Sequence, residues 1–295
     1  MTLRTLVCSL ALLLHVHAVR AADDGLDPQS TTTAGDTRVT SIDSTTFVPP
    51  SSNERMEYTV SYLGITIGKA ALFSGKVDAS TAPIFLQAKT ASIAAMFTLK
   101  QQLASYVDPA TGVPRSGQLD AVEGSYRHTD TFTYDRKALP NRATVREKAS
   151  TGKDETRSFA LPVGTIDFVS LVYRLRHLKL EPGTKYTFHV LTGRILSTAV
   201  VEVVGREELS TGIGKVQTIK VRVPTAFAGK FAEKNPSFVW LTDDPRRIVA
   251  RIATDFAIGH ATASLDSYAP GEPPPAPPAV ATEPASATKA PSSTP

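Results

Sequence analysis

Hydrophobic and polar residues alternate along most of the segment 55–268, which is the pattern of β-strands with one buried face. The alternation is clearest in 56–62, where every second residue is large and apolar: Met56, Tyr58, Val60 and Tyr62. The same period predicts further strands at about 69–77, 83–91, 99–107, 126–134, 142–148, 185–191, 195–204, 215–223, 237–241, 247–255 and 257–267. Turn sequences such as Asp108-Pro109 separate many of them. We therefore expect a mainly β domain whose curved antiparallel sheet closes into a barrel, a half-barrel or a sandwich.

Two places break this alternation. At Gly64 the apolar face moves to the opposite parity, which predicts a bulge or a sharp bend. Between about 167 and 180 the period is helical instead, because five apolar residues fall on one side of a helix: Phe168, Leu171, Val172, Leu175 and Leu178. Thr165 or Asp167 is expected to cap this helix, and Pro182-Gly183 to end it. We expect the amphipathic helix to pack on the curved sheet.

The first 21 residues have the pattern of a secretory signal peptide. A basic start is followed by an apolar run, Leu6–Val19, and by small residues. The run is shorter than the roughly 20 residues that a membrane-spanning helix needs. Cleavage after Ala21 fits best, with cleavage after Ala18 as the alternative. We expect a periplasmic protein whose mature chain has no transmembrane span; secretion or attachment to the cell surface is the alternative.

Two polar segments flank the β-rich domain. Residues 22–54 are rich in Ser, Thr and Asp, and residues 269–295 are dominated by Pro, Ala, Ser and Thr. Neither composition supports a packed core, so we expect a disordered leader and a disordered tail. The tail is either a solvated spacer or a tether to other envelope components. The globular domain is then 55–268, which is long enough to form one stable core.

Composition excludes several kinds of chemistry. The single cysteine, Cys8, lies in the signal peptide, so the mature chain has no disulfide, no thiolate metal site and no cysteine nucleophile. Removal of Arg4 and Arg20 with the signal lowers the net charge from +4 to +2. Because the charges are mixed along the chain, we expect no nucleic-acid partner. The sequence contains no nucleophile elbow, zinc-protease motif or phosphate-binding glycine loop, and we expect no cofactor, no metal site and no catalytic residue.

The strand predicted at 126–134 carries the most suggestive polar residues. Period-two geometry places Tyr126, His128 and Asp130 on one face, where an imidazole beside a carboxylate could bind a polar head group. The alternative is a hydrogen-bonded pair with a structural role.

Two further places offer candidate binding residues. On the predicted helix, Tyr173 and Arg176 continue a polar row, spaced by three residues, that begins at Asp167. The row either faces solvent or a cleft, or consists of a cap, a tyrosine at the edge of the core and an arginine paired with a carboxylate of the sheet. Trp240 is expected to be a core anchor, with a sugar-stacking platform as the alternative. Asp244-Pro245 is expected to form a turn between two strands.

Six stretches of the chain resemble a bacterial envelope family known as domain of unknown function 3108. They follow one another in the expected order: Tyr58–Gly68, Ser105–Pro109, Glu123–Tyr126, Asp167–Arg176, Leu180–Gly183 and Val239–Arg247. The resemblance implies an exported, β-rich domain. It supplies no catalytic residues, because the family has no established activity.

Three functions are consistent with these observations. The first is a non-catalytic binding or carrier module for a lipid or glycolipid, held by strands that are apolar on both faces. The second is a structural envelope protein with a solid core, whose Pro-rich tail contacts a protein partner. The third is an envelope hydrolase that uses His128 and Asp130 as acid and base.

Overall fold

The computed structural model describes residues 39–40, 47–90, 98–223, 237–255 and 260–273. The predicted signal peptide and most of the predicted leader and tail lie outside these residues, so their boundaries stay predictions. Residues 47–54 and 269–273 of the two flanks are described and adjoin the domain. Within the described ranges, no helix is both long and apolar enough to cross a membrane.

A single sheet of 16 strands accounts for most of the described chain. In sequence order the strands are β1 (Val39–Thr40), β2 (Arg55–Tyr62), β3 (Ile65–Ser74), β4 (Ala82–Thr90), β5 (Leu99–Val107), β6 (Pro114–Glu123), β7 (Tyr126–Asp135), β8 (Asn141–Ala149), β9 (Asp154–Leu161), β10 (Ile166–Asp167), β11 (Lys185–Thr192), β12 (Ile195–Thr211), β13 (Gly214–Val223), β14 (Ser237–Thr242), β15 (Val249–Asp255) and β16 (His260–Ala269). Their spatial order is β1-β11-β12-β13-β14-β15-β16-β2-β3-β4-β5-β6-β7-β8-β9, with β10 also beside β11. Only β1 and β10 pair in parallel, both with β11.

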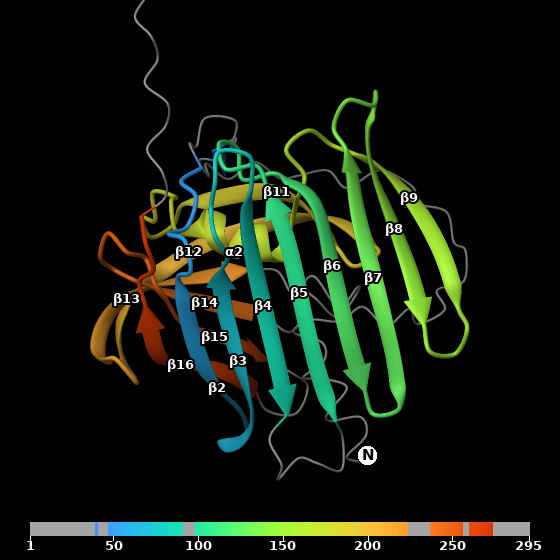
Figure 1. Cartoon of the computed structure of the whole chain (residues 1–295). Coiled ribbons are helices and arrows are strands. Elements are labelled where there is room, and N and C mark those ends of the chain that lie inside the picture. The colour runs from blue at the N-terminus through green and yellow to red at the C-terminus, as the bar shows by residue number, and fades with distance from the viewer. Residues whose placement is uncertain (1–38, 41–46, 91–97, 224–236, 256–259, 274–295) are drawn as a thin grey trace, which may run out of the picture.

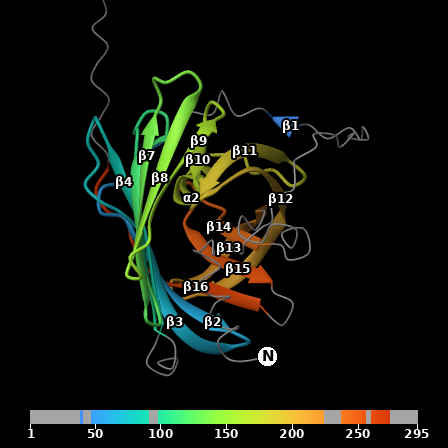
Figure 2. The ribbon, with the colours of Figure 1, turned by 90° about the vertical axis from the view of Figure 1, so that its right-hand side faces the viewer.

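The sheet curls so that its two ends face each other (Figures 1 and 2). In Figure 2, strands β2–β9 form one wall and β11–β16 the opposite wall, with helix α2 (Phe168–Leu175) between them. The described strands form no closed ring of hydrogen bonds, because the path ends at β9 on one side and at β11 with its two short partners on the other. The predicted mainly β fold is confirmed, and the sheet is a curved half-barrel rather than a closed barrel.

Helix α2 begins at its predicted cap and ends earlier than predicted. Asp167 is the N-cap, and its carboxylate accepts a 2.8 Å hydrogen bond from the backbone of Ser170. The helix ends at Leu175, and the chain then tightens into i→i−3 bonds, such as that from His177 to Arg174. The apolar face is buried as the stripe predicts, and Leu178 is buried beyond the helix end.

Two groups of buried side chains hold the walls together. The larger group combines α2 with residues from both walls, including Tyr58, Leu72 and Ile219. The smaller group joins β6–β9 to the opposite end of the sheet, because Leu191 belongs to the same cluster as Phe132 and the half-buried Leu196 packs against that cluster. Side-chain packing therefore covers the gap that hydrogen bonds leave open.

The structure contains two long strands that the hydrophobic pattern did not predict. Strand β6 has few large apolar residues on its buried face, where Leu119 is followed by Ala121 and Glu123. Strand β9 lies at the edge of the sheet and is mostly exposed and polar. At Gly64 the chain forms a tight hairpin turn with positive φ at both Leu63 and Gly64, and the register shift lies in the adjoining strands.

Candidate functional site

An apolar hollow lies between the concave face of the sheet and helix α2, and we call it the apolar trough. It encloses a cavity of about 60 Å³. Its lining comes from β2–β5, β15, β16 and the helix: Tyr58, Val60, Lys69, Ala70, Leu72, Leu86, Ala88, Lys89, Leu99, Phe168, Val169, Val172, Ile252 and Ala263. Several apolar lining residues are only half-buried, among them Leu86, Phe168 and Ile252. The trough can therefore contact an apolar chain.

The trough forms because neighbouring strands have small side chains on their concave face, where larger side chains would fill the space. Ala70 on β3 lies directly opposite Ala88 on β4, and Ala263 on β16 lies opposite Val60. Leu86 and Ala88 face the interior because side chains two positions apart share a face of the sheet.

The strand residues Tyr126, His128 and Asp130 lie at a second place, which we call the seam cluster. As predicted, they share one face of β7, and this face is concave. The Tyr126 hydroxyl donates a 2.8 Å hydrogen bond to Glu147 on β8, and Gln101 on β5 donates a 3.2 Å hydrogen bond to Glu123. The rings of Tyr126 and His128 are 5.2 Å apart. The cluster is polar and buried, and it adjoins β9 at the end of the sheet.

Arg194 links the seam cluster to the opposite end of the sheet. It lies in the turn between β11 and β12 and donates hydrogen bonds to Glu147 and to Glu155, the latter at 3.1 Å. The Lys153 ammonium lies 3.0 Å from Glu147. The sequence analysis missed Arg194, because nothing in the spacing of the chain relates a hairpin turn to strands about forty residues earlier.

The electrostatics of the seam cluster follow from these contacts. Burial raises the pKa of Tyr126 to about 12, and the hydrogen bond to Glu147 acts in the same direction. Burial opposes ionisation of Glu147, but hydrogen bonds from Tyr126 and Lys153 and the charge of Arg194 hold the pKa of Glu147 below its ordinary value. Glu147 is thus kept as a buried carboxylate that accepts hydrogen bonds.

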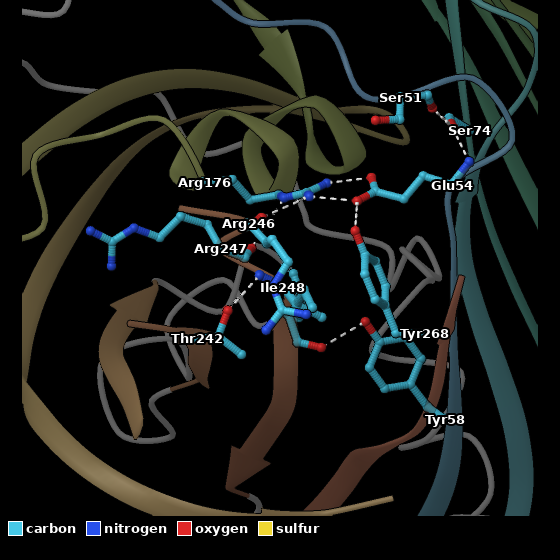
Figure 3. A network of polar contacts seen from close by, with 11 residues as sticks. Ser51, Glu54, Tyr58, Ser74, Arg176, Thr242, Arg246, Arg247, Ile248 and Tyr268 are labelled. Carbon is cyan, nitrogen blue, oxygen red and sulfur yellow. Dashed lines mark hydrogen bonds and ion pairs between the residues drawn. The ribbon is translucent and has the colours of Figure 1, made fainter. Parts of the chain in front are cut away.

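Arg176 lies in a third place, the Arg176–Glu54 network (Figure 3), and Tyr173 lies beside it. Arg176 donates two hydrogen bonds to Glu54, at 2.6 and 2.7 Å, and two more to the backbone carbonyls of Arg246 and Arg247. Tyr268 donates a 3.0 Å hydrogen bond to the same carboxylate. The network joins the end of the helix to Glu54 just before β2, to the β14–β15 turn and to β16.

The predicted polar row on the helix is buried, so it does not face solvent. Asp167 accepts a hydrogen bond from Ser105, and its burial raises the pKa of the carboxyl group. Tyr173 is fully buried, and its hydroxyl has no hydrogen-bond partner among the described residues. The guanidinium of Arg176 lies 5.3 Å from the centre of the Tyr173 ring. The pairing of Arg176 with a carboxylate agrees with the second interpretation of this row.

His177 lies beside this network. Its ring meets Phe47 edge to face at 6.1 Å. Burial lowers the pKa of His177 to about 4, and the positive charge of Arg176 contributes. The imidazole is therefore neutral near pH 7.

Trp240 is a buried hydrophobic residue that belongs to neither of the two buried groups. The indole nitrogen donates a 2.5 Å hydrogen bond to Glu207, and Lys220 lies 5.1 Å from the ring centre. Only 7% of the residue is exposed, so neighbouring side chains cover the ring. Trp240 is thus buried, as expected of a core anchor, and Phe238 and Lys220 lie against its ring. Asp244 forms the predicted turn, where it accepts hydrogen bonds from Arg246.

The six candidate residues therefore do not converge on one site. Tyr126, His128 and Asp130 lie in the seam cluster, Arg176 in the network with Tyr173 beside it, and Trp240 elsewhere. Among the described residues, no group of three or more His, Cys, Asp or Glu side chains is arranged to hold a metal ion. The trough, which no single motif signalled, is the place best suited to an apolar ligand.

Comparison with one solved structure supports the fold, and two others match with lower scores. A β-barrel-like protein of unknown function DUF1849 from Brucella abortus is similar over 76% of this chain and 100% of its own, with a TM-score of 0.53 and 10% identity. A candidate exported protein with a YmcC-like fold from Bacteroides fragilis covers 76% of this chain and 99% of its own, with a TM-score of 0.30 and 9% identity. A candidate lipoprotein from Parabacteroides distasonis covers 77% and 100%, with a TM-score of 0.29 and 9% identity.

Sequence comparison gives the family. No curated protein matches the chain. The family described as "Protein of unknown function (DUF3108)" matches residues 57–266, which span β2 to β16 and include helix α2. The match covers the curved sheet except β1 and the outer ends of β2 and β16, and it agrees with the motifs found in the sequence. The chain belongs to the DUF3108 family.

Proposed function

We propose that this protein is an exported, non-catalytic binding module of the bacterial cell envelope, and that the apolar trough holds one apolar chain of a lipid or glycolipid. The observation that carries the proposal is the set of half-buried apolar side chains around the trough. Burying them against a ligand chain contributes about 25 cal/mol for each Å² removed from water.

The size of the cavity limits how much of the ligand fits inside the trough. A volume of about 60 Å³ is well below the 300–1,000 Å³ of pockets that enclose a whole ligand. The ligand therefore inserts the end of one apolar chain, and the rest of it stays outside the trough. In this proposal, residues 1–21 direct export to the periplasm, where the lipid binds. The exported chain consists of the leader 22–54, the domain 55–268 and the tail 269–295.

The experiment compares substitutions on the two faces of one strand. The mature protein is exported to a bacterial periplasm, purified without detergent and titrated with a fluorescent fatty acid. Leu86→Arg places a charge in the trough, whereas Gln87→Arg places the same charge on the outer face of β4. We expect Leu86→Arg to weaken binding at least tenfold and Gln87→Arg to leave it unchanged.

A second variant separates loss of binding from loss of folding. Ala88→Leu fills the trough with apolar atoms and keeps the residue compatible with the strand. It should reduce fatty-acid binding while thermal unfolding stays cooperative. Equal binding by the wild type, Leu86→Arg and Ala88→Leu would reject the trough as the site.

The small cavity also favours a second candidate function. A structural envelope protein needs a solid core, and a cavity of about 60 Å³ leaves the interior nearly filled. In that case native mass spectrometry of the protein from the periplasm would give the mass of the mature chain alone. Deletion of 269–295 would then abolish capture of an envelope protein partner without altering the fold.

A further inference from the structure

Two hollows lie side by side on the outer face of the sheet, opposite the trough. One has a volume of about 520 Å³ and is lined by residues of β2–β5 and β16, including Lys69, Lys89 and Lys100. The other has a volume of about 530 Å³ and is lined by residues of β5–β8, including Lys100, Arg127 and Lys148. The two hollows share Lys100 and Gln102, so they adjoin.

Strand register arranges the cations in a line, which we call the basic strip. Lys69 on β3 lies directly opposite Lys89 on β4, and Lys89 lies opposite Lys100 on β5. The strip continues through Val122 on β6 to Arg127 on β7, with Lys148 on β8 nearby. Neighbouring strands are about 4.8 Å apart, so the strip spans about 24 Å from β3 to β8.

Among the described residues, most of these charges form no ion pair. Lys69 pairs with Asp266 at 2.8 Å. Lys89, Lys100, Arg127 and Lys148 are exposed, and none of them forms an ion pair within the part of the chain that the structure describes. Asp154 lies opposite Lys148, but its carboxylate forms an ion pair with Arg146 at 2.6 Å. Like charges directly opposite on a sheet are destabilising. A bound external anion would therefore reduce the repulsion between the cations of the strip.

Glu57 and Asp266 line the first hollow and Asp120 lines the second, but cations outnumber carboxylates in both linings, which favours a phosphate-bearing head group. Lysine ammonium groups are point-charge donors that suit phosphate oxygens. Between them, the Gln87 amide donates a 2.9 Å hydrogen bond to Gln102, which leaves amide groups to contact a head group's neutral atoms. The small side chain of Ala71 lies at the first hollow, and each hollow has a volume in the range of ligand pockets.

We propose that the basic strip docks on an anionic phospholipid surface, with head-group phosphates entering the two hollows. Charge complementarity carries this assignment: the cations extend over about 24 Å, farther than one phosphate group reaches, and an anionic bilayer presents phosphates over any such length. The strip side chains lie on the face of β3–β5 opposite the apolar trough, although Lys69 and Lys89 also belong to the lining of the trough. The proposal concerns a different contact, with head groups rather than an apolar chain, from the proposed lipid-binding function.

The experiment measures binding of the mature chain to vesicles by flotation. Vesicles of phosphatidylcholine alone are compared with vesicles that contain 30% phosphatidylglycerol, at low and high salt. Each basic residue near an anionic surface contributes about a factor of five to partitioning, so Lys89→Glu/Lys100→Glu should lower binding to the anionic vesicles at least 25-fold. The double variant should keep its thermal stability, because both positions are exposed, one like-charge pair is exchanged for another between 89 and 100, and Lys69 gains an opposite charge at 89.

The control is Lys179→Glu/Lys215→Glu, which makes the same change of charge at two exposed sites elsewhere. This control should retain most of the binding. An equal loss in both double variants would overturn the strip as a site. Binding of inorganic polyphosphate with none to anionic vesicles would overturn the membrane assignment and leave a soluble phosphate chain as the ligand of the strip.

Discussion

The Arg176–Glu54 network and the seam cluster both contain a buried glutamate that binds an arginine, but their surroundings differ. Arg176 and Glu54 have side chains that are 7% and 3% exposed, and the other donors of Arg176 go to backbone carbonyls. Glu147 is equally buried, whereas its lysine partner Lys153 is 35% exposed and Glu155 is 43% exposed. The Arg176–Glu54 network is sealed from solvent, whereas the seam cluster is open to solvent on one side.

This difference indicates which of the two ion pairs constrains the geometry of the fold more strongly. A buried pair is a weak source of net stability but a strong constraint on geometry, because removing one partner leaves an uncompensated charge. The network joins four parts of the chain through one guanidinium. The seam cluster shares its charge among several cations, so each of them is less critical.

The largest effect is expected from breaking the sealed pair. Arg176→Ala should lower the free energy of unfolding by about 3–5 kcal/mol, because Glu54 stays buried without its partner. Urea denaturation of Arg176→Ala, Glu54→Gln and the double variant measures the coupling. Additive losses in the double variant would show that the two side chains act independently.

The second prediction concerns pH and the same region. His177 has a pKa of about 4 in the folded protein against an ordinary value of 6.5. The folded state therefore binds fewer protons than the unfolded state between these values, so the stability is complete above pH 6.5 and is lost as the pH falls toward 4. The loss from this one group is about 2–3 kcal/mol.

A variant isolates this contribution from that of the acidic residues. His177→Gln should lose about 2–3 kcal/mol less than the wild type between pH 7 and pH 4. Denaturant unfolding of both proteins across this range gives the difference directly. Parallel pH profiles would mean that His177 titrates normally in the folded state.

The smallest effect is expected from opening the seam. Arg194→Ala should cost about 1–3 kcal/mol, because Glu147 keeps its contacts with Lys153 and Tyr126. The cost should fall in 1 M salt, where the Debye length is about 3 Å. The matched control is Arg206→Ala, which removes an exposed pair with Asp243 and should cost less than about 1 kcal/mol. A loss as large as that of Arg176→Ala would contradict the distinction between the two regions.

The sequence predicts the elements well where one face is apolar. Strand β5 is found at the predicted bounds, and helix α2 starts at its predicted cap. Strand β6 was missed because its buried face contains Ala121 and Glu123, whose burial depends on neighbouring strands. The local pattern carries no information about such a partner.

The candidate residues show the same limit. The common face of Tyr126, His128 and Asp130 follows from strand geometry and was predicted. The partners Glu54 and Arg194 were not, because 122 residues separate Glu54 from Arg176 and 47 separate Glu147 from Arg194. The trough arises from small residues on different strands, and only the register brings them together.

The pairing of β16 with β2 has a mechanical consequence. Just outside these strands, Ser52 and Glu272 exchange two backbone hydrogen bonds, at 2.6 and 2.8 Å, so both ends of the domain emerge side by side. A force that pulled residues 47 and 273 apart would load the hydrogen bonds between β2 and β16 one after another, from the Ser52–Glu272 end, rather than all at once. Glu54 and Tyr268 lie next to this pair and are joined by a hydrogen bond, so after the Ser52–Glu272 bonds the next resistance to tension comes from the side chains around Arg176.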